Sequence, residues 1–279
     1  MTTVGIATGA GRGMGLACAR RLAELVDVLL LVDRDGPAAA AAVEQLNGEK
    51  HLATAESVVL DITDVEGLAR LAGRAGELGT LRAVAHAAGI SPSMADWRRI
   101  FTVDLVGTAR LARALRPLAT AGTAMVCFAS MAPYLEPGTP DPDALAVLDD
   151  PLDEKFLERL HDVMGPRIED RGVAYTWAKR GVHRFVHHEA VRLGPVGARI
   201  CSVSPGHIDT PQGRQEQESH PSIARMVALT PLGRTGLAEE VAAGVAFLLS
   251  GDASFVNGTD LLIDGGVGAA LWGAAAQRR

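Results

Sequence analysis

Short apolar runs alternate with amphipathic stretches along almost the whole chain. The runs predict seven buried strands, at residues 4–8, 28–32, 58–60, 81–88, 123–129, 199–204 and 260–263. Stretches with apolar residues at helical spacing lie between them, at 13–25, 38–46, 65–78, 97–118, 175–193 and 238–249. Strands that are apolar throughout and alternate with helices are typical of a parallel sheet covered on both faces. With right-handed crossovers, the sequence predicts an α/β fold built on a doubly wound parallel seven-stranded sheet.

One segment, residues 131–174, interrupts this alternation. Its first part contains several prolines, which disfavour regular structure. An Asp-Pro pair then predicts a helix over 151–164, because these residues suit the cap and the first helical position. Phe156 and Leu160 lie on the apolar face of this helix, and a Gly-Pro pair ends it. We therefore predict a single domain, residues 1–279, with an inserted helical flap at 131–174.

The composition excludes several classes of protein. With 279 residues, 48% of them hydrophobic and 22% charged, the chain suits a globular domain with a sizeable core. A net charge of −6 and the lack of a basic tract predict no nucleic-acid partner. No apolar run is long enough to cross a membrane, and no secretory pattern precedes the first strand, so we expect a cytoplasmic protein. Three scattered cysteines predict neither a disulfide framework nor a metal site.

Glycines gather where the first predicted strand meets the first predicted helix. Glycine lets the backbone turn tightly and approach a pyrophosphate, and the helix N-terminus adds free N–H groups and a positive dipole end. A tight turn alone needs one or two glycines, but the position between strand and helix favours a dinucleotide phosphate site. The predicted cofactor loop comprises Gly9, Gly11, Arg12, Gly13, Met14 and Gly15.

Asp33 follows the second predicted strand, 18 residues after Gly15. A carboxylate there can accept hydrogen bonds from the ribose hydroxyls of adenosine and repels a 2′-phosphate. The alternative is a residue that merely ends the strand. Arg12 and Arg34 complicate the choice of cofactor, because either side chain suits a phosphate. We predict NAD as the cofactor, with NADP less favoured.

Tyr175 and Lys179 predict a site of proton transfer. Four residues apart on a predicted helix, the two side chains share one face. Free tyrosine has a pKa near about 10, and a neighbouring cation lowers it, so that Tyr175 becomes a usable general acid and base. Ser130 ends the fifth predicted strand, where ligand sites of open α/β sheets gather. Its hydroxyl suits a substrate carbonyl oxygen, although a serine at a strand end is also an ordinary turn residue.

In this order the motifs resemble those of the short-chain dehydrogenase/reductase family, in its single-domain branch, over essentially the whole chain. The resemblance implies a Rossmann fold and an NAD(P)-dependent enzyme that acts on CH–OH groups. It implies catalytic roles for Ser130, Tyr175 and Lys179, the last two also contacting the cofactor. Further cofactor contacts, from the adenine to the nicotinamide, are implied for Asp61, Ile62, Ala88, Gly89, Pro205, Gly206, Ile208 and Thr210.

Two positions depart from the family pattern. His86 and Ala87 stand where the family has two asparagines, so amide contacts that stabilise the central strand are lost or altered. Asp104 stands where the family has an asparagine that helps to anchor a water between the lysine and solvent. We expect Asp104 to take part in catalysis, because a carboxylate can accept hydrogen bonds and can hold Lys179 or its water electrostatically.

The leading hypothesis for function is the interconversion of a small-molecule secondary alcohol and a ketone by hydride transfer. The alternatives are a catalytically inactive nucleotide-sensing protein, and epimerisation or dehydration on the same scaffold. The long flap resembles that of 3α-hydroxysteroid dehydrogenase/carbonyl reductase, which implies a hydroxysteroid or another bulky apolar substrate. Residues 210–231, polar and glycine-bearing, predict a mobile lid over that substrate.

The resemblance also implies a homo-oligomer, a homodimer first and a homotetramer second. In the family, the helices that correspond to 97–118 and 175–193 commonly pack against their copies across a two-fold axis. The flap must bury its apolar face, so it either masks this interface or contributes Phe156, Leu160 or Met164 to a new one. In both cases we expect the flap to wall the substrate pocket above Ser130.

Overall fold

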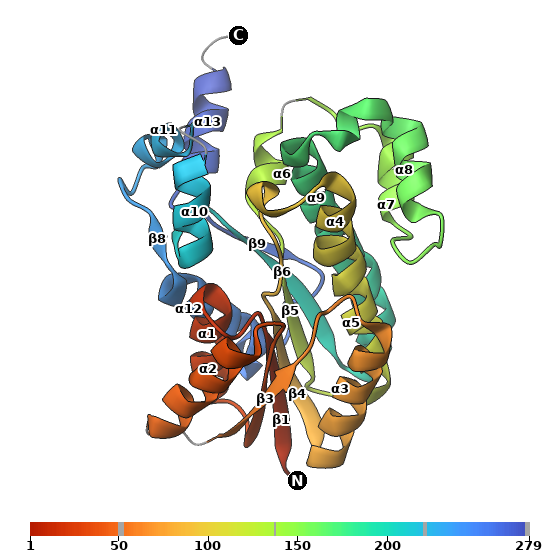
Figure 1. The fold of residues 1–279 in the computed structure, drawn as a ribbon, viewed down its shortest axis with the longest axis vertical. Helices are drawn as coiled ribbons and strands as arrows, with labels where there is room; N and C mark the ends of the chain where they lie inside the picture. Colours follow the sequence, from red (N-terminus) through yellow and green to blue (C-terminus); the bar gives the residue numbers. More distant parts are fainter. Residues whose placement is uncertain (50–52, 137, 220–221, 277–279) are drawn as a thin grey trace.

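Seven parallel strands form the central sheet of the computed structural model, which describes residues 1–49, 53–136, 138–219 and 222–276 (Figure 1). Across the sheet the strands run in the order β3-β2-β1-β4-β5-β6-β9. This order confirms the predicted doubly wound α/β fold. The winding reverses between β1 and β4, which leaves a crevice at the carboxyl ends of these strands. The bounds are Thr3–Thr8 (β1), Val28–Asp33 (β2), Thr54–Val59 (β3), Thr80–His86 (β4), Ala124–Phe128 (β5), Arg199–Pro205 (β6) and Asp260–Ile263 (β9).

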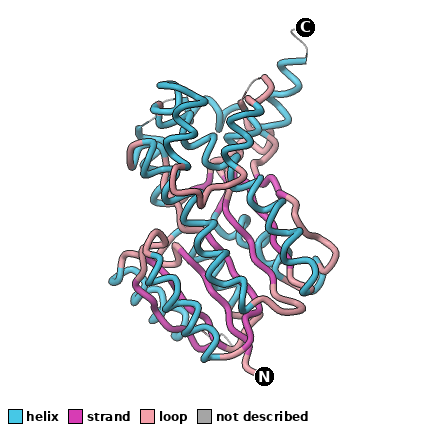
Figure 2. The backbone as a smooth tube through the Cα atoms, turned by 90° about the vertical axis from the view of Figure 1, so that its right-hand side faces the viewer, coloured by secondary structure: helices cyan, strands magenta, loops and turns pink. Residues whose placement is uncertain are grey.

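Helices cover both faces of the sheet (Figure 1, Figure 2). Buried side chains of one strand alternate between two hydrophobic cores: Leu30 packs on the side of α9, and Leu29 and Leu31 pack on the side of α1. Burial on both faces explains why the central strands are apolar throughout. One face carries α1 (Gly13–Leu22), α2 (Gly36–Gly48) and α12 (Ala238–Leu249), and the other carries α3 (Val65–Leu78), α4 (Trp97–Phe101), α5 (Thr108–Leu115) and α9 (Arg171–Leu193).

The structure corrects several predicted boundaries. β3 begins at Thr54, not at residue 58, because it lies at the sheet edge, where only Ala55 is buried and the strand is not apolar throughout. α1 ends at Leu22, three residues early. α9 begins at Arg171, four residues before Tyr175, because Asp170 caps it by accepting a hydrogen bond from Val173 N at 2.9 Å.

The helix predicted over 97–118 is interrupted. Between α4 and α5 the chain makes a π-helical turn, Thr102–Gly107, and after α5 it makes a 3₁₀ turn, Arg116–Leu118. The π-helical turn contains Asp104. Such turns are rare and frequently occur at functional sites.

The flap contains three helices: α6 (Ala132–Leu135), α7 (Pro142–Leu148) and α8 (Phe156–Met164). The prediction of irregular structure around the prolines was wrong at Pro133, in the first turn of α6, and at Pro142. Pro142 occupies the first turn of α7, where no N–H is needed, and Asp141 caps the helix by accepting from Asp143 N at 2.8 Å. The helix predicted from residue 151 begins only at Phe156. Pro137 lies outside the described residues.

The flap packs on its own subunit. Phe156 and Leu160 are 2% and 0% exposed, and the Phe156 ring meets Phe101 of α4 edge-to-face at 5.8 Å between centroids. Asp149, after α7, pairs with Arg184 of α9 at 2.5 Å. Of the two predicted arrangements, the structure shows the flap covering its own helices. Phe156 and Leu160 are therefore core residues and do not supply the suggested interface, whereas Met164, the third residue proposed for it, is partly exposed.

The segment predicted as a lid is helical. It contains α10 (Pro211–Ser219) and α11 (Ser222–Leu229), while residues 220–221 lie outside the described chain. Two short strands flank it, β7 (Ile208–Asp209) and β8 (Gly236–Leu237), and pair in parallel with each other. The last helix, α13 (Val267–Ala276), lies near α11 (Figure 1). Among the described helices, none has the length and apolar character needed to cross a membrane.

His86, at the end of β4, links strands to helix through a chain of hydrogen bonds. Its Nδ1 lies 2.7 Å from Thr8 Oγ1, and its Nε2 lies 2.9 Å from Thr108 Oγ1. The Thr108 hydroxyl donates to Asp104 O, and Thr8 Oγ1 accepts from Ala88 N. Nε2 must then be the donor nitrogen, because the Thr108 hydroxyl proton is already used, and in the neutral ring Nδ1 accepts from the Thr8 hydroxyl. The amide contacts expected to be lost at this position are thus replaced by imidazole contacts.

Burial, with a smaller contribution from the charge of Lys179, lowers the pKa of His86 from 6.5 to about 3. Between these values the unfolded chain binds a proton that the folded chain does not, so the folded state loses stability as pH falls from 6.5 towards 3. We predict that, between about pH 7 and about pH 5, the native protein loses about 2 kcal/mol more of its free energy of unfolding than His86→Asn does. Urea unfolding of both proteins at both pH values measures this difference. Equal losses would show that His86 is not the buried neutral base described.

Candidate active site

The loop between β1 and α1 has a backbone that only glycine allows. Gly9 and Gly13 have positive φ angles of 63° and 56°. A Cβ on Gly15 would lie 2.0 Å from Gly9 O, and one on Gly11 would lie 2.8 Å from the Ala38 side chain. The loop therefore closes tightly and presents the start of α1 without side chains in the way, as a pyrophosphate site requires.

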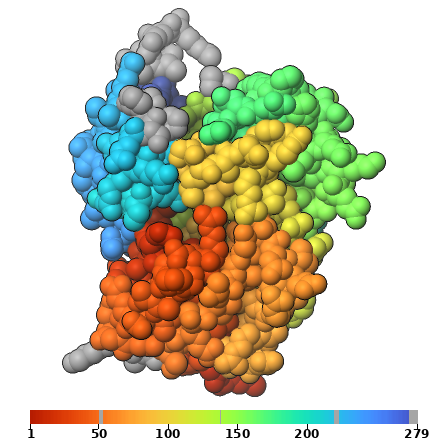
Figure 3. All heavy atoms as spheres, viewed as in Figure 1, coloured from red at the N-terminus to blue at the C-terminus, as the bar shows by residue number. Residues whose placement is uncertain are grey.

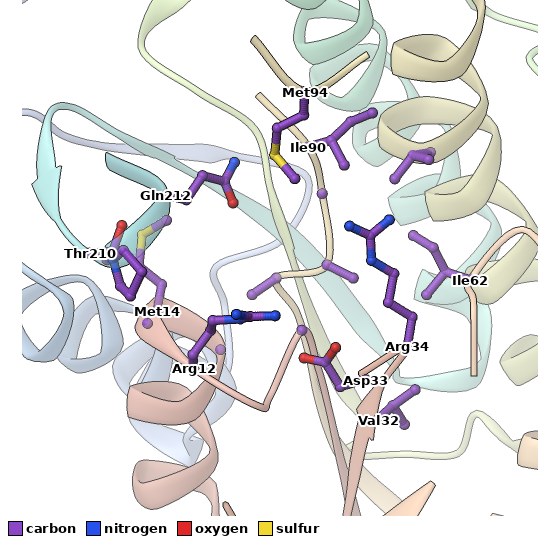
Figure 4. A pocket seen from close by; sticks show the side chains of 18 of the residues that line it. Arg12, Met14, Val32, Asp33, Arg34, Ile62, Ile90, Met94, Thr210 and Gln212 are labelled. Carbon is purple, nitrogen blue, oxygen red and sulfur yellow. The ribbon is translucent and has the colours of Figure 1, made fainter. Parts of the chain in front are cut away.

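The adenosine end of the cleft carries a carboxylate next to two arginines. Asp33 Oδ2 accepts a hydrogen bond from Gly11 N at 2.9 Å, and Oδ1 accepts from Asp35 N at 3.0 Å. Arg12 pairs with Asp35 at 2.9 Å. Figure 4 shows Arg12, Asp33 and Arg34 gathered around one cavity. The glycine cradle with a carboxylate at the ribose position fits a nicotinamide dinucleotide.

The same cavity is also lined by Asp61, Ile62, Ala88 and Gly89, for which the family resemblance implies cofactor contacts. Asp61 Oδ2 pairs with Arg99 at 2.7 Å, and Oδ1 accepts from Thr63 at 2.9 Å and 2.8 Å. Burial alone would raise the pKa of Asp61, but the bonds from Thr63 and Arg99 together lower it below its usual value. No sequence pattern pointed to Arg99, because its partner Asp61 lies 38 residues away and no motif includes it.

Two cavities meet at the carboxyl end of the sheet and share Met14, Thr210 and Gln212. The second has a volume of about 1400 Å³. Three predicted residues line neither: Gly11 packs against Ala38, while Lys179 and Asp104 are buried behind the walls. The first cavity is lined by Gly9, Arg12, Gly13, Met14, Gly15, Asp33, Arg34, Asp61, Ile62, Ala88, Gly89 and Thr210, and the second by Met14, Ser130, Tyr175, Pro205, Gly206, Ile208 and Thr210.

Tyr175, Lys179 and Ser130 come together where the second cavity reaches the sheet. Lys179 Nζ lies 5.5 Å from the centre of the Tyr175 ring and donates to Phe128 O at 3.1 Å. Burial raises the pKa of the Tyr175 phenol, while the Lys179 charge and the Ser130 hydroxyl act to lower it. The net pKa is raised, contrary to the expectation from Lys179 alone, because burial disfavours the phenolate more than one cation favours it.

Asp104 lies directly behind Lys179. Its carboxylate is buried; Oδ1 accepts from Ile90 N at 2.8 Å, and Oδ2 lies 3.8 Å from Lys179 Nζ. Within the described chain Oδ2 has no hydrogen-bond partner. Burial raises the pKa of this carboxyl, and the charge of Lys179 opposes the rise. Asp104 therefore contacts Lys179 but neither cavity.

The flap walls the second cavity only with its two ends. Ala132 and Leu135 of α6 line it on one side, and Asp170 and Arg171 line it on the other. The predicted wall, the helix now called α8, packs away from the cavity on α4. The expectation for the flap was therefore correct for its ends and wrong for its central helix.

Helix α10 closes the front of the second cavity by a contact that sequence patterns did not reveal. Glu216 Oε1 accepts hydrogen bonds from Ser93 N, at 3.1 Å, and from the Ser93 hydroxyl. In Figure 3, α10 (cyan) meets the yellow segment near α4, which follows Ser93. The Glu216 charge is close enough to contribute to the raised pKa of Tyr175.

In the part of the chain that is described, no group of three or more His, Cys, Asp or Glu side chains is arranged to hold a metal ion.

Several enzymes of known activity are similar to this chain. A cis-4-hydroxycyclohexanecarboxylate dehydrogenase from Sinomonas cyclohexanicum is 31% identical over 94% of this chain and 95% of its own. The trans-4-hydroxycyclohexanecarboxylate dehydrogenase of the same organism is 28% identical over 94% and 92%. A galactitol 2-dehydrogenase (L-tagatose-forming) from Cereibacter sphaeroides is 28% identical over 93% and 92%.

Solved structures share the fold. A short-chain type dehydrogenase/reductase from Mycobacterium ulcerans superposes with a TM-score of 0.77 and 25% identity, over 96% of this chain and 90% of the other. A short-chain dehydrogenase from Burkholderia cenocepacia in complex with NADP superposes with a TM-score of 0.73 over 94% and 96%. At 22% identity this second likeness shows the fold alone and does not distinguish between NAD and NADP for this chain.

A family model described as enoyl-(acyl carrier protein) reductase matches residues 9–139 and 162–268. The unmatched residues between these two ranges, 140–161, contain α7 and most of α8, so this part of the flap is an addition to the family framework. The match covers most of the chain, and the relatives named above are dehydrogenases. The chain therefore belongs to the short-chain dehydrogenase/reductase family and is an NAD(P)-type oxidoreductase acting on CH–OH groups.

Proposed function

We propose that this enzyme uses NAD to interconvert a ring-bearing secondary alcohol and the corresponding ketone. The observation that carries the proposal is the position of Tyr175, Ser130 and Lys179 where the dinucleotide cleft meets a cavity of about 1400 Å³. The apolar side chains in that cavity, with its volume, suit a cyclic substrate better than a short alcohol. They are Met131, Leu135, Ile223, Met226 and Val227. A hydroxysteroid is one member of this class, and the relatives that act on hydroxycyclohexanecarboxylates favour a single ring.

In the proposed mechanism Ser130 donates a hydrogen bond to the reacting oxygen of the substrate. Tyr175 takes the hydroxyl proton during oxidation and returns it to the carbonyl oxygen during reduction. Lys179 favours the phenolate form of Tyr175 by its charge. NAD, when bound, supplies the acceptor and donor of hydride. Pro205, Gly206, Ile208 and Thr210 are positioned to hold its nicotinamide end.

The preference for NAD over NADP follows from Asp33. Its carboxylate lies at the mouth of the cleft and is fixed by two backbone N–H groups. A 2′-phosphate at the ribose would approach this fixed negative charge. Of the two arginines that line this part of the cleft, Arg12 is already paired with Asp35, and Arg34 is the one that a 2′-phosphate would meet.

We predict that Asp33→Ala weakens NAD binding by about 1–3 kcal/mol, the cost of a lost charged hydrogen bond. Binding of NADP should change less or improve, because the repelling charge is gone. Titration of both nucleotides by calorimetry, against wild type and variant, measures the two effects. A wild-type protein that binds NADP more tightly than NAD would contradict the proposed preference.

We predict that Tyr175→Phe lowers turnover by a factor of about 10²–10⁴, the usual contribution of general acid–base catalysis. The ring keeps its packing but carries no proton, so NAD affinity should remain near the wild-type value. Reduced-nicotinamide absorbance with cyclic and short secondary alcohols measures turnover, and calorimetry measures binding. Full activity in the variant would place the proton transfer on another residue.

Asp104 is proposed as a positioning residue that acts through Lys179. Its charge lies 3.8 Å behind the ammonium and contributes to the raised pKa of Tyr175. Asp104→Asn keeps an oxygen to accept from Ile90 N and removes the charge. We predict that the pH profile of kcat/KM for alcohol oxidation then shifts to lower pH, because the phenolate forms more easily. Superimposable profiles would show that the carboxyl carries no charge in the folded enzyme.

The assembly proposed is a homodimer, with a homotetramer as the alternative. Since the flap covers α4 and contacts the middle of α9 at Arg184, the usual two-helix interface is masked there. Other faces must then supply the contact. The helices α10 and α11 are proposed as a lid over the substrate cavity, with the contact between Glu216 and Ser93 as its closed position.

A further inference from the structure

Four acidic side chains line the substrate cavity, and the structure gives each of them a partner. Glu169 meets His161 Nε2 at 2.8 Å, and Glu216 accepts from Ser93 N at 3.1 Å. The other two are Asp170, which caps α9, and Asp209, which pairs with Arg214. Each of these four carboxylates therefore already interacts with another group of the protein.

Three arginines also line the cavity, and one of them differs from the others. Arg214 pairs with Asp209 at 2.5 Å, and Arg234 pairs with Glu240 at 2.7 Å. Across the described chain, the guanidinium of Arg171 makes no ion pair and no hydrogen bond. The cavity thus offers one cation that has no anion of its own.

Arg171 is placed in line with the catalytic tyrosine. It is the first residue of α9, and Tyr175 follows one turn later on the same face. Four residues advance about 6 Å along a helix, which is comparable to the width of a substituted six-membered ring. Both side chains line the cavity, and apolar side chains such as Met226 and Leu135 line the space with them. The positive end of the helix dipole adds to the attraction for an anion at this position.

We propose that the substrate is a cyclic alcohol with a carboxylate on its ring, and that Arg171 binds this carboxylate while Tyr175 faces the hydroxyl group. This deepens the proposed function and rests on it. Arginine suits this task, because its planar fork can donate two parallel hydrogen bonds to a carboxylate. Arg171 is then a specificity-determining residue, since it contacts the substrate at the end remote from the reacting carbon.

The test compares three substrates: 4-hydroxycyclohexanecarboxylate, its methyl ester and cyclohexanol. For Arg171→Gln we expect KM for the carboxylate to rise roughly ten- to a hundredfold, the effect of a lost charged hydrogen bond. KM for the ester and for cyclohexanol should stay within about twofold of the wild type, because neither carries the charge. Arg171→Lys should fall between, because lysine keeps the charge and loses the fork.

The matched control is Arg167→Gln. Arg167 lies four residues before Arg171, is exposed, and pairs with Glu136 outside this cavity. It should leave all three KM values unchanged. A second measurement does not depend on turnover: binding of cyclohexanecarboxylate, which has no hydroxyl group, to the complex with reduced nucleotide. We expect Arg171→Gln to weaken this binding as much as it raises KM, and Arg167→Gln to leave it unchanged.

Two results would overturn the proposal. One is a wild-type enzyme that oxidises cyclohexanol and the carboxylate with equal kcat/KM. The other is an Arg171→Gln variant that binds cyclohexanecarboxylate as the wild type does. If the wild type oxidises none of the three alcohols, the proposed activity on ring alcohols fails. The binding comparison still decides whether Arg171 holds a carboxylate, so the two failures are distinguishable.

Discussion

The buried ammonium of Lys179 is the interaction around which the catalytic half of the protein is arranged. Lys179 is 5% exposed, and a buried cation without partners is costly. Two separate parts of the chain meet it: Phe128 O at the end of β5, at 3.1 Å, and Asp104 in the π-helical turn, at 3.8 Å. Gly89 makes the close approach possible, because a Cβ there would lie 3.0 Å from Asp104 Oδ1 and 3.4 Å from Lys179 Nζ. The end of β5, the π-helical turn and Gly89 together accommodate the single buried charge of Lys179.

The charge of Lys179 also affects His86, at the centre of the sheet. Lys179 contributes, after burial, to the lowered pKa of His86, which keeps that imidazole neutral. A neutral ring has one donor and one acceptor, and the hydrogen bonds from Thr8 to Asp104 O need both. The backbone of Asp104 is thereby tied to β1 and β4, and its side chain to Lys179. This is how a histidine can replace the asparagine of the family pattern without leaving buried polar groups unpaired.

The sequence was sufficient for most of the fold and for the residues at the strand ends. Strands buried on both faces are apolar throughout, so β1, β2 and β5 were found close to their true bounds. The edge strand β3 was placed too late, because only one of its six residues is buried and the strand is therefore not apolar throughout. The flap helices were misplaced because prolines were taken to disfavour helix, although Pro142 occupies the one position where it favours helix.

Features of the site that depend on the local backbone could be predicted from the sequence, and those that depend on a partner from elsewhere in the chain could not. The glycines of the cofactor loop are fixed by their own backbone angles and contacts, which a short motif records. Arg99 and Glu216 are defined by Asp61 and Ser93, which lie 38 and 123 residues away. The direction of the Tyr175 pKa depends on how deeply the phenol is buried, which no spacing of residues reveals.

The flap connects its helices α7 and α8 to the helix that carries Tyr175. Its helices α7 and α8 pack on α4 and α9 and add to the core. Its last turn, Gly165–Glu169, buries Ile168 and leads to Asp170, which caps α9 five residues before Tyr175. The cap fixes where α9 begins, and so it places Arg171 at the cavity, one turn from the phenol. Arg171 and its capping residue Asp170 lie in the range that the family model matches, so the proposed recognition of a carboxylate depends on where α9 begins and not on the added helices α7 and α8.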